Sequence, residues 1–487
     1  MTKDLTAGSP LRVIVAFTLP LLIGNLFQQL YAFTDAAVVG QLLGVQALAA
    51  VGASGSLHFL LIGFTFGAAA GLGIPIARAF GAGDLAAMRR HVAAGAMVSG
   101  GIALAITTIG ELAARPMLRL LGTPAELMPA AATFLTVIFW GSGAIMAFNF
   151  LAAVIRALGD SRTPLYFLIV SCVLNAGLVY FFIAVLGTGI GGAAMATGIA
   201  QLTAVLACLA LIGKRMPELR LRREDWRLHP GELAGSARSG LTMGFQMSVI
   251  AIGAVILQPA INRLGSDAVA ATTAAMRVDQ LAVAPLASFG AAITTFVAQN
   301  RGALQWQRIR QGVFRTLLAT WGLSVLLGGV IILAGTSIVQ LFVGEGEAAV
   351  VEMAHQYLVI NGVLYPILAT LFVLRNAIQG LGSTGVPTIA GFMELLFRGS
   401  AGLFLVAPFG IIGVAFAAPL AWIGGLRPAV GGWVAPPRER LRRERGGGPP
   451  PRVLVPGFAH RRELLGRERG ELPAQVEPVL RSSLATA

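Results

Sequence analysis

Long runs of apolar residues dominate the chain, and they are apolar on every face rather than at every second position. About 20 apolar residues, coiled as a helix, cross the roughly 30 Å hydrocarbon core of a bilayer. A strand of a membrane β-barrel would instead alternate over about ten residues. The pattern predicts twelve membrane-spanning helices, near residues 13–39, 47–75, 92–113, 130–155, 164–186, 191–213, 239–261, 269–298, 313–335, 353–378, 387–407 and 411–434.

The composition favours a membrane protein and argues against a soluble one. Of the 487 residues, 56% are hydrophobic and only 12% are charged, which leaves too little polar surface to keep a folded domain dissolved. The 61 glycines suit helices that pack closely in lipid. We therefore expect an all-α polytopic protein whose main surroundings are the lipid bilayer.

The chain also repeats itself at an offset of about 221–223 residues. Three segments recur in the same order: 44–50 (GVQALAA) as 265–271 (GSDAVAA), 155–164 (IRALGDSRTP) as 378–387 (IQGLGSTGVP), and 189–194 (GIGGAA) as 410–415 (GIIGVA). Six spans per repeat is an even number, so both halves should enter the membrane from the same side. Two pseudo-symmetric six-helix bundles around a shared cleft are a common plan of transporters.

The repeat sets the expected domain boundaries. Residues 1–213 form the N-terminal six-helix lobe, residues 214–238 a cytoplasmic loop between the lobes, and residues 239–434 the C-terminal lobe. Residues 435–487 form an Arg-, Gly- and Pro-rich basic tail that cannot bury a core, so we expect it to be disordered.

Lys and Arg are divided unevenly between alternate loops, and cytoplasmic loops of membrane proteins collect these residues. The N-terminal segment and every second loop hold most of them, including seven between Lys214 and Arg238 and, at a loop edge, Arg375. The alternate loops hold Arg115, Arg119 and Arg263. We therefore expect both termini in the cytoplasm, in a plasma (inner) membrane. Since topology accounts for most of the net charge of +14, no nucleic-acid partner is expected.

Asp35 is the clearest charged residue inside a span. A charge at mid-bilayer costs at least about 2.5–3.5 kcal/mol on insertion scales, so an intramembrane carboxylate suggests a function. Gln28, Tyr31 and Asp35 are spaced i, i+3 and i+7 and share one helix face, which we expect to line a wet interior. There Asp35 can exchange a proton or bind a small cation. The alternative is an interfacial carboxylate near the outer end of the span.

Other polar residues within the spans allow two interpretations each. Asn175 and Thr197 offer neutral oxygen atoms in the same half, either as ligands or as hydrogen-bonding contacts between helices. Glu394 and Arg398 are spaced i, i+4, so they can neutralise each other as a structural pair, or they can belong to the transport pathway.

Arg277 and Asp279 lie roughly 30 Å of helix from Gln299 at about 1.5 Å per residue. That places both near the outer interface, and the favoured interpretation is a pair of solvated charges.

Several other classes of function are not supported. Residues 187–192 (GTGIGG) match a dinucleotide-binding pattern, but no strand, βαβ unit or acidic ribose ligand accompanies them. No Walker A motif appears, so transport should be coupled to an ion gradient. His, Asp and Glu do not cluster within the spans, and Cys172 and Cys208 lie in apolar segments. We expect no enzymatic activity, no cofactor and no metal beyond a possible sodium ion.

The sequence resembles the multidrug and toxic compound extrusion (MATE) family. The matching segments are 20–40 (PLLIGNLFQQLYAFTDAAVVG), 47–52 (ALAAVG), 155–164 (IRALGDSRTP) and 294–303 (TTFVAQNRGA), and the resemblance covers roughly residues 10–425. It implies twelve spans in two lobes that form a V-shaped cleft. It also implies export of amphipathic, mostly cationic drugs or toxic metabolites in exchange for protons or sodium ions, and we expect a monomer.

The resemblance also implies a site. Prokaryotic members bind a cation around an Asp of span 1, an Asn of span 5 and a Thr of span 6, and Asp35, Asn175 and Thr197 stand at those positions. Many relatives have a second Asp one turn after the Asn, where this chain has Val179, which favours protons over sodium. Spans 7 and 10 are nearly free of acids, so the coupling ion is expected in the first half. Gln28, Tyr31 and Glu394 are the candidates for the substrate cleft.

The C-terminal end departs from the family pattern. Arg427 and Pro428 are expected to interrupt span 12, and the basic tail follows. Either the reading frame changed near residue 425, or a genuine tail contacts anionic lipid. The alternative function is a flippase for lipid-linked saccharides, which would favour a strongly cationic cleft. The spans of the first half show few Arg or Lys, so we favour drug export.

Overall fold

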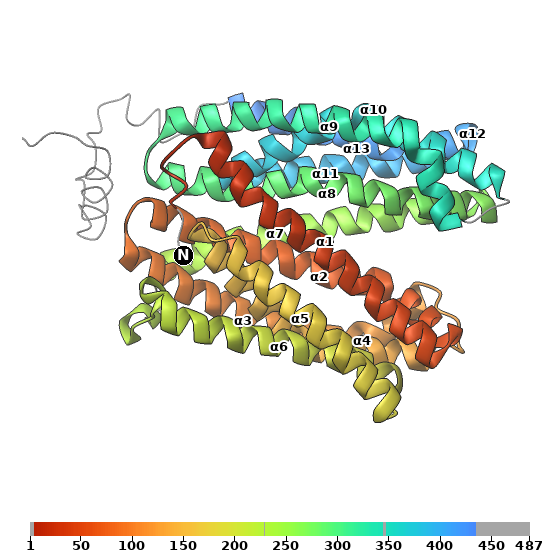
Figure 1. Cartoon of the computed structure of the whole chain (residues 1–487), viewed down its shortest axis with the longest axis horizontal. Helices are drawn as coiled ribbons and strands as arrows, with labels where there is room; N and C mark the ends of the chain where they lie inside the picture. Colours follow the sequence, from red (N-terminus) through yellow and green to blue (C-terminus); the bar gives the residue numbers. More distant parts are fainter. Residues whose placement is uncertain (1–3, 228, 344–346, 435–487) are drawn as a thin grey trace, which may run out of the picture. The chain divides into compact units, whose positions relative to one another are not determined.

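The computed structural model describes residues 4–227, 229–343 and 347–434, and within these ranges all regular structure is helical (Figure 1). The helices are α1 (Pro10–Leu43), α2 (Val45–Gly81), α3 (Leu85–Leu120), α4 (Met128–Ala157), α5 (Arg162–Tyr180), η1 (Phe181–Val185), α6 (Gly189–Arg215), η2 (Pro217–Leu219), η3 (Arg223–Trp226), α7 (Pro230–Asn262), α8 (Ser266–Gly302), α9 (Trp306–Val343), α10 (Ala348–Gly380), α11 (Gly385–Phe404), α12 (Val406–Phe409) and α13 (Ile411–Val434). The predicted all-α membrane fold is confirmed.

Eleven helices of the described residues are long and apolar enough to cross a membrane. The remaining long helix, α11, has 20 residues and carries Glu394 and Arg398, so it falls outside that set. Both of its charged groups turn toward neighbouring helices, as described below. The face of a helix that packs against other helices can bury such charges away from lipid.

The last helix differs from the sequence-based expectation. Arg427 and Pro428 do not interrupt it, because α13 continues through both to Val434. Ending a helix inside a bilayer would leave backbone N–H and C=O groups without water to bind them, so continuing past a proline costs less than stopping. The expected disorder of residues 435–487 concerns a segment that lies outside the described residues.

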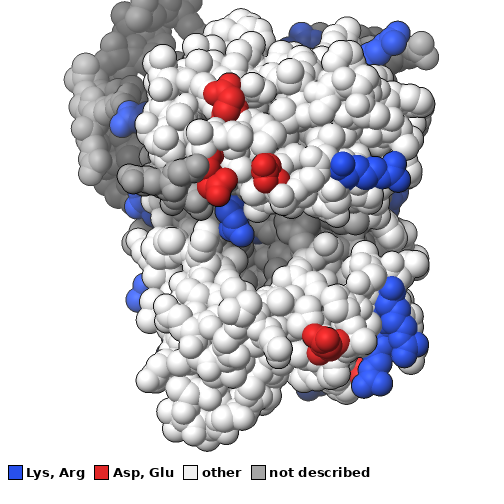
Figure 2. All heavy atoms as spheres, turned by 90° about the vertical axis from the view of Figure 1, so that its right-hand side faces the viewer, with Lys and Arg blue, Asp and Glu red and all other residues white. Residues whose placement is uncertain are grey.

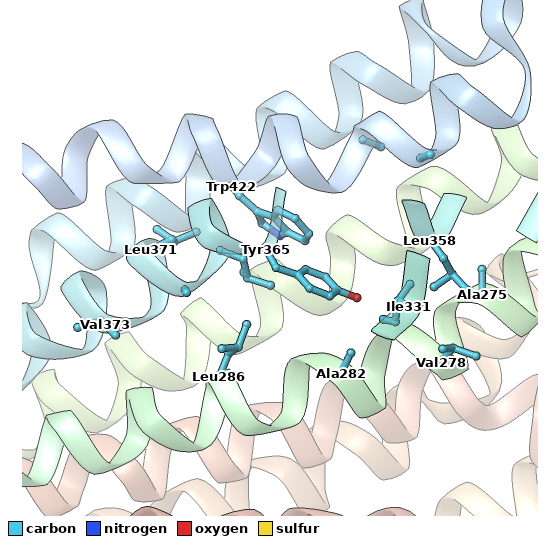
Figure 3. Packing of buried hydrophobic residues seen from close by; sticks show 14 of the residues in the cluster. Ala275, Val278, Ala282, Leu286, Ile331, Leu358, Tyr365, Leu371, Val373 and Trp422 are labelled. Carbon is cyan, nitrogen blue, oxygen red and sulfur yellow. The ribbon is translucent and has the colours of Figure 1, made fainter. Parts of the chain in front are cut away.

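The helices pack in two groups with separate cores. Buried side chains of α2, α3, α4 and α6 form one large cluster, and those of α8, α9, α10 and α13 form another. Figure 3 shows part of the second cluster, where the rings of Tyr365 and Trp422 lie tilted toward each other, with centroids 6.4 Å apart, among aliphatic side chains. Both groups are seen in Figure 1, with α1 crossing between them. The division of the chain at residues 213 and 238 stays a prediction.

Small residues bring the two groups into close contact. A side chain at Gly67 or Gly71 of α2 would meet the backbone oxygen of Met243 or Ser239 of α7 at 2.5 or 2.4 Å, so only glycine fits there. The ends of α2 and α8 also touch, since a Cβ atom on Gly81 would lie 2.0 Å from the carbonyl oxygen of Gln299. These contacts fix the arrangement of the helices that carry the candidate site.

The segment before α7 is more ordered than a simple loop. The helix begins at Pro230 rather than near residue 239, because proline suits the first turn of a helix, where no N–H partner is needed. Its first-turn Glu232 forms an ion pair of 2.7 Å with Arg90 of α3. Asp225 of η3 accepts a second ion pair of 3.5 Å from Arg89. Both acids tie the connecting segment to α3.

The turn between α4 and α5 is built around Asp160. Its carboxylate accepts hydrogen bonds from the backbone N–H groups of Arg162 and Thr163, both of 3.0 Å, and from the Thr163 hydroxyl at 2.7 Å. Burial by itself opposes ionisation, but the hydrogen bonds from Thr163 outweigh it, and the pKa of Asp160 lies below its usual value. The turn thereby sets where α5 begins and how it presents Asn175.

Candidate functional site

A carboxylate and an amide meet between α1 and α5. The side-chain N–H of Asn175 donates a hydrogen bond to Oδ1 of Asp35, with an N···O distance of 2.5 Å. Asn175 is buried, with 1% of its surface exposed, and Asp35 is half-buried on a helix that has no other acidic residue. Two of the residues expected from the family resemblance therefore lie in direct contact.

Thr197 of α6 and Tyr31 of α1 complete this group. The Thr197 hydroxyl donates to the backbone oxygen of Ala193 at 3.3 Å and adjoins both Asp35 and Tyr31. The hydroxyl oxygen of Tyr31 and Oδ1 of Asn175 are buried and have no hydrogen-bond partner among the described residues. Buried polar atoms usually find a partner in protein, water or an ion, so these two atoms call for one.

The chemistry of this group suits a small cation or a proton. Asn175 uses its N–H to bind Asp35, which leaves its oxygen free as a ligand. A carboxylate, an amide oxygen and two hydroxyls are hard oxygen donors, which bind hard cations. Ionised Asp35 can also take up a proton directly. In the described residues no group of three or more His, Cys, Asp or Glu side chains is placed to hold a metal ion.

Val179 explains why the group contains one carboxylate. It lies one turn after Asn175, is fully buried, and packs with Val39 and Ile183. The position where the family resemblance implies a second acid is thus part of a small apolar cluster. A second carboxylate there would be buried among aliphatic side chains, which is costly.

Gln28 is not part of this group. It is exposed, and no hydrogen bond joins it to Asp35 within the described part of the chain. The contacts of α1 with α8 come from other positions. Asn25 donates to the hydroxyl of Ser288 at 2.9 Å, and the guanidinium of Arg277 lies 5.1 Å from the centre of the Phe33 ring. Figure 2 shows one end of the molecule with a hollow near its middle, with acidic and basic side chains beside its upper edge and mostly uncharged surface below it.

Glu394 has a different partner from the one expected. Its carboxylate pairs with Arg375 of α10 at 2.6 Å rather than with Arg398, and the two side chains are 10% and 4% exposed. Arg375 was expected at a cytoplasmic loop edge, but it lies within α10, which continues to Gly380. Glycine at position 425 of α13 leaves room for Glu394, because a Cβ atom there would lie 2.9 Å from its carboxylate. The ion pair expected with Arg398 is therefore made with Arg375, and the role of Glu394 in the substrate cleft stays a prediction.

The structure also corrects the interpretation of Asp279. Tyr365 of α10 donates a hydrogen bond of 2.8 Å to its Oδ1, so Asp279 faces neighbouring helices rather than solvent. Arg277, two residues earlier, is exposed as expected. Depth along a helix, which the sequence gives, does not tell which face a residue occupies. One clue to the contact of Asp279 with a neighbouring helix was its place in the chain. It lies thirteen residues inside α8, about 20 Å from the start of the helix.

Comparison with known proteins shows the family to which this chain belongs. The model of the MatE family matches residues 20–181 and 243–399. The chain is 30% identical over 382 residues to the probable multidrug resistance protein YpnP of Bacillus subtilis (strain 168), covering 78% of this chain and 84% of that protein. It is 26% identical over 430 residues to the probable multidrug resistance protein NorM of Bradyrhizobium diazoefficiens, covering 85% and 87%.

A solved structure has the same fold. An outward-facing multidrug resistance MATE family transporter of the MOP superfamily superposes with a TM-score of 0.81 at 22% identity, covering 91% of this chain and 98% of that one. The relatives are transporters rather than enzymes, as expected, and they are multi-pass membrane proteins that act on small molecules. The chain therefore belongs to the MatE family and is a membrane transporter for multidrug efflux.

Proposed function

We propose that this transporter is a secondary active antiporter that exports amphipathic, mostly cationic drugs in exchange for protons or sodium ions. The observation that carries the proposal is the contact between Asp35 and Asn175, with unpartnered oxygen atoms of Asn175 and Tyr31 beside it. A carboxylate in a membrane span is expensive to maintain, so it usually serves a function. Among the described residues, Asp35 has neighbouring oxygen atoms that can bind an ion, and no cationic side chain forms an ion pair with it.

Exchange of a proton or cation at Asp35 can affect the contacts of several helices. Asp35 is on α1, while Asn175 and Thr197 are on α5 and α6, so a proton or cation at the carboxylate changes contacts among three helices. The same α1 touches α8 through Asn25 and Ser288. If the ion and the drug favour different arrangements of these helices, each weakens the binding of the other, and the coupling is reciprocal.

The single carboxylate favours the proton as coupling ion. Val179 removes the second acid that many relatives have, and one carboxylate with neutral oxygens holds sodium less strongly than two. A cationic drug would be attracted to the same negative charge when Asp35 is ionised. We place the transporter in the plasma (inner) membrane as a monomer with both termini in the cytoplasm.

Replacing Asp35 tests this function. Cells that express the Asp35→Asn variant should accumulate ethidium to the level of cells without the transporter, while the variant inserts in the membrane at normal amounts. The matched control is Glu111→Gln, since Glu111 is exposed on α3 and has no partner among the described residues. Export by Asp35→Asn equal to that of the unchanged protein would refute the proposal.

A further inference from the structure

The N-terminal segment that precedes α1, residues 4–9, is bound to the second group of helices. The backbone N–H of Leu5 donates a hydrogen bond of 3.1 Å to Oε1 of Gln299, and its backbone oxygen accepts one of 3.2 Å from Nδ2 of Asn300. The Leu5 side chain is 1% exposed and belongs to the core of the second group. Both the backbone and the side chain of Leu5 therefore fix the segment to that group.

Arg308 of α9 holds the rest of the segment. Its guanidinium donates hydrogen bonds to the backbone oxygens of Leu5 at 3.1 Å and Ala7 at 2.8 Å, and to that of Gly8. It also lies 5.6 Å from the centre of the buried Phe296 ring. A planar guanidinium can bind several oxygens while it lies over a ring, which the compact ammonium of lysine does less well. Gly8 has a φ of +76°, which suits glycine and turns the chain into α1.

Gln299 connects this contact to the first group of helices. It is fully buried, and while its oxygen accepts from Leu5, its side-chain N–H donates a hydrogen bond of 2.7 Å to the backbone oxygen of Ala157 in α4. Without Leu5, the oxygen of this buried amide would lack its donor, which is costly. The loss would favour an arrangement in which water reaches Gln299, so the N-terminal segment stabilises the contact between the two groups.

The end of the molecule that carries this segment is closed. The backbones of α2 and α8 touch there at Gly81 and Gly302, where an added Cβ atom would lie 2.0 Å from a backbone oxygen. Figure 1 shows α1 beginning at one end of the molecule, and Figure 2 shows the opposite end, with a hollow near its middle. A transporter that takes up drug from the closed side has to separate these contacts, since access alternates between the two sides.

We propose that the N-terminal segment is a latch that holds the two groups of helices together at the closed end, and that this end opens only after Leu5 leaves Gln299 and Arg308. The latch is bound to α8 and α9, while the chain continues directly into α1, which carries Asp35. A displacement of α1 therefore acts on the latch. The proposal goes beyond the proposed function, because the latch is needed whichever ion and drug are exchanged.

The test measures how often the closed end opens. In the purified full chain in lipid nanodiscs, with Cys172 and Cys208 replaced by alanine, a maleimide labels a single cysteine introduced at Ala298 or at Ala292. Both positions are buried on α8, but Ala298 packs in the core of the first group and Ala292 in that of the second. When opening is rare, the labelling rate follows the open fraction. Labelling at Ala298 therefore reports separation of the groups, and labelling at Ala292 reports loosening of the second group.

Weakening the latch should speed labelling at Ala298 and leave Ala292 unchanged. Arg308→Gln and Leu5→Ala should each raise the rate at Ala298 about tenfold or more, because one removes hydrogen bonds of a charged group and the other removes a buried side chain. Leu5→Met keeps an apolar side chain of similar volume, so its rate should stay close to that of the unchanged protein. The matched control is Arg310→Gln, since Arg310 is exposed on the same helix, and it should alter neither rate.

An unchanged rate at Ala298 in both Arg308→Gln and Leu5→Ala would overturn the proposal. An equal rise at Ala298 and Ala292 would also overturn it, because it would show loss of packing inside the second group. If Arg308→Gln does not fold, Arg308→Lys tests the same contact and should still speed labelling at Ala298, since it keeps the charge but not the fork of donors. The measurement uses no drug and no ion gradient, so a failure of ion-coupled export would not decide its outcome.

Discussion

Glu394, Asp279 and Asp35 are carboxylates within membrane-spanning helices that contact other helices, and each is accommodated in a different way. Glu394 is neutralised by the guanidinium of Arg375, Asp279 is bound by the hydroxyl of Tyr365, and Asp35 is bound by the amide of Asn175. An ion pair in low dielectric holds its charge, whereas a carboxylate bound only by neutral donors can gain or lose a proton. Glu394 therefore has a cationic partner, whereas Asp279 and Asp35 have neutral ones.

The pair of Glu394 and Arg375 should matter for stability rather than for drug binding. Glu394→Ala leaves a buried guanidinium without its partner and should lower the free energy of unfolding by about 3–5 kcal/mol. The double variant Arg375→Met with Glu394→Met removes both charges and should be markedly more stable than the single variant. Thermal unfolding in detergent measures this. Equal losses in the single and double variants would show that the pair is not what stabilises this region.

At the residue scale, the sequence predicted part of the site and missed another part. Periodicity placed Tyr31 and Asp35 on one face, and the family resemblance supplied Asn175, which the structure brings into contact with Asp35. The prediction that Glu394 pairs with Arg398 was wrong. Spacing of i, i+4 shows which residues of one helix are neighbours, but not which side chain an adjacent helix places beside them. Arg375 lies on that adjacent helix, and helix packing alone reveals it.

At the scale of single helices, close packing depends on a few glycines. Gly81 at the end of α2 touches the backbone of Gln299, and Gly302 at the end of α8 touches the backbone of Arg78. Gln299 also accepts a hydrogen bond from the Leu5 N–H at 3.1 Å and donates one to the oxygen of Ala157 at 2.7 Å. One end of the two helix groups is therefore joined by α2, α8, α4 and the N-terminal segment.

Gly81→Ala should weaken this joint. A methyl group there would overlap the carbonyl oxygen of Gln299, and overpacking of this kind costs about 1–3 kcal/mol. The control is Gly55→Ala on the same helix, since nothing lies within 4 Å of a Cβ atom at that position. We expect faster labelling of a cysteine introduced at Gln299, which is fully buried, in Gly81→Ala but not in Gly55→Ala. Unchanged labelling in both would contradict the tight contact.

Element boundaries were predictable to within a few residues, except where the helices extend beyond the apolar runs. Polar residues lie close to both ends of the helices α7 and α8, so hydropathy underestimates the length of these helices. Pro428 was expected to stop α13, but a bilayer offers no water for the freed backbone groups. Composition signals what lies in lipid, whereas hydrogen bonding determines where a helix ends.

At the scale of the whole molecule, the charge distribution predicts how the helices are oriented. With both termini in the cytoplasm, the segment between α6 and α7 should face the cytoplasm, and the turn between α3 and α4 should face outward. In a variant without Cys172 and Cys208, a cysteine at Glu224 should react with a membrane-impermeant maleimide only in inside-out vesicles. A cysteine at Glu126 should react in intact cells. Both positions are exposed, so a cysteine at either one is accessible to the reagent from its own side of the membrane. The reverse labelling pattern would therefore show an inverted topology.

Two separate cores joined by glycine-rich contacts allow each group of helices to move as a unit while α1 keeps contact with both. We propose that an ion bound at Asp35 and a drug held between the two groups would influence each other through α1. We propose that the charge of Asp35 couples ion binding to drug binding.

Drug-driven ion movement in sealed proteoliposomes tests that claim most directly. An imposed ethidium gradient should drive protons, reported by a trapped pH indicator, in the opposite direction to the drug, and a trapped sodium indicator decides whether sodium moves instead. Asp35→Asn should abolish the ion movement, while Glu111→Gln should match the unchanged protein. Ion movement in Asp35→Asn at the rate of the unchanged protein would contradict the account.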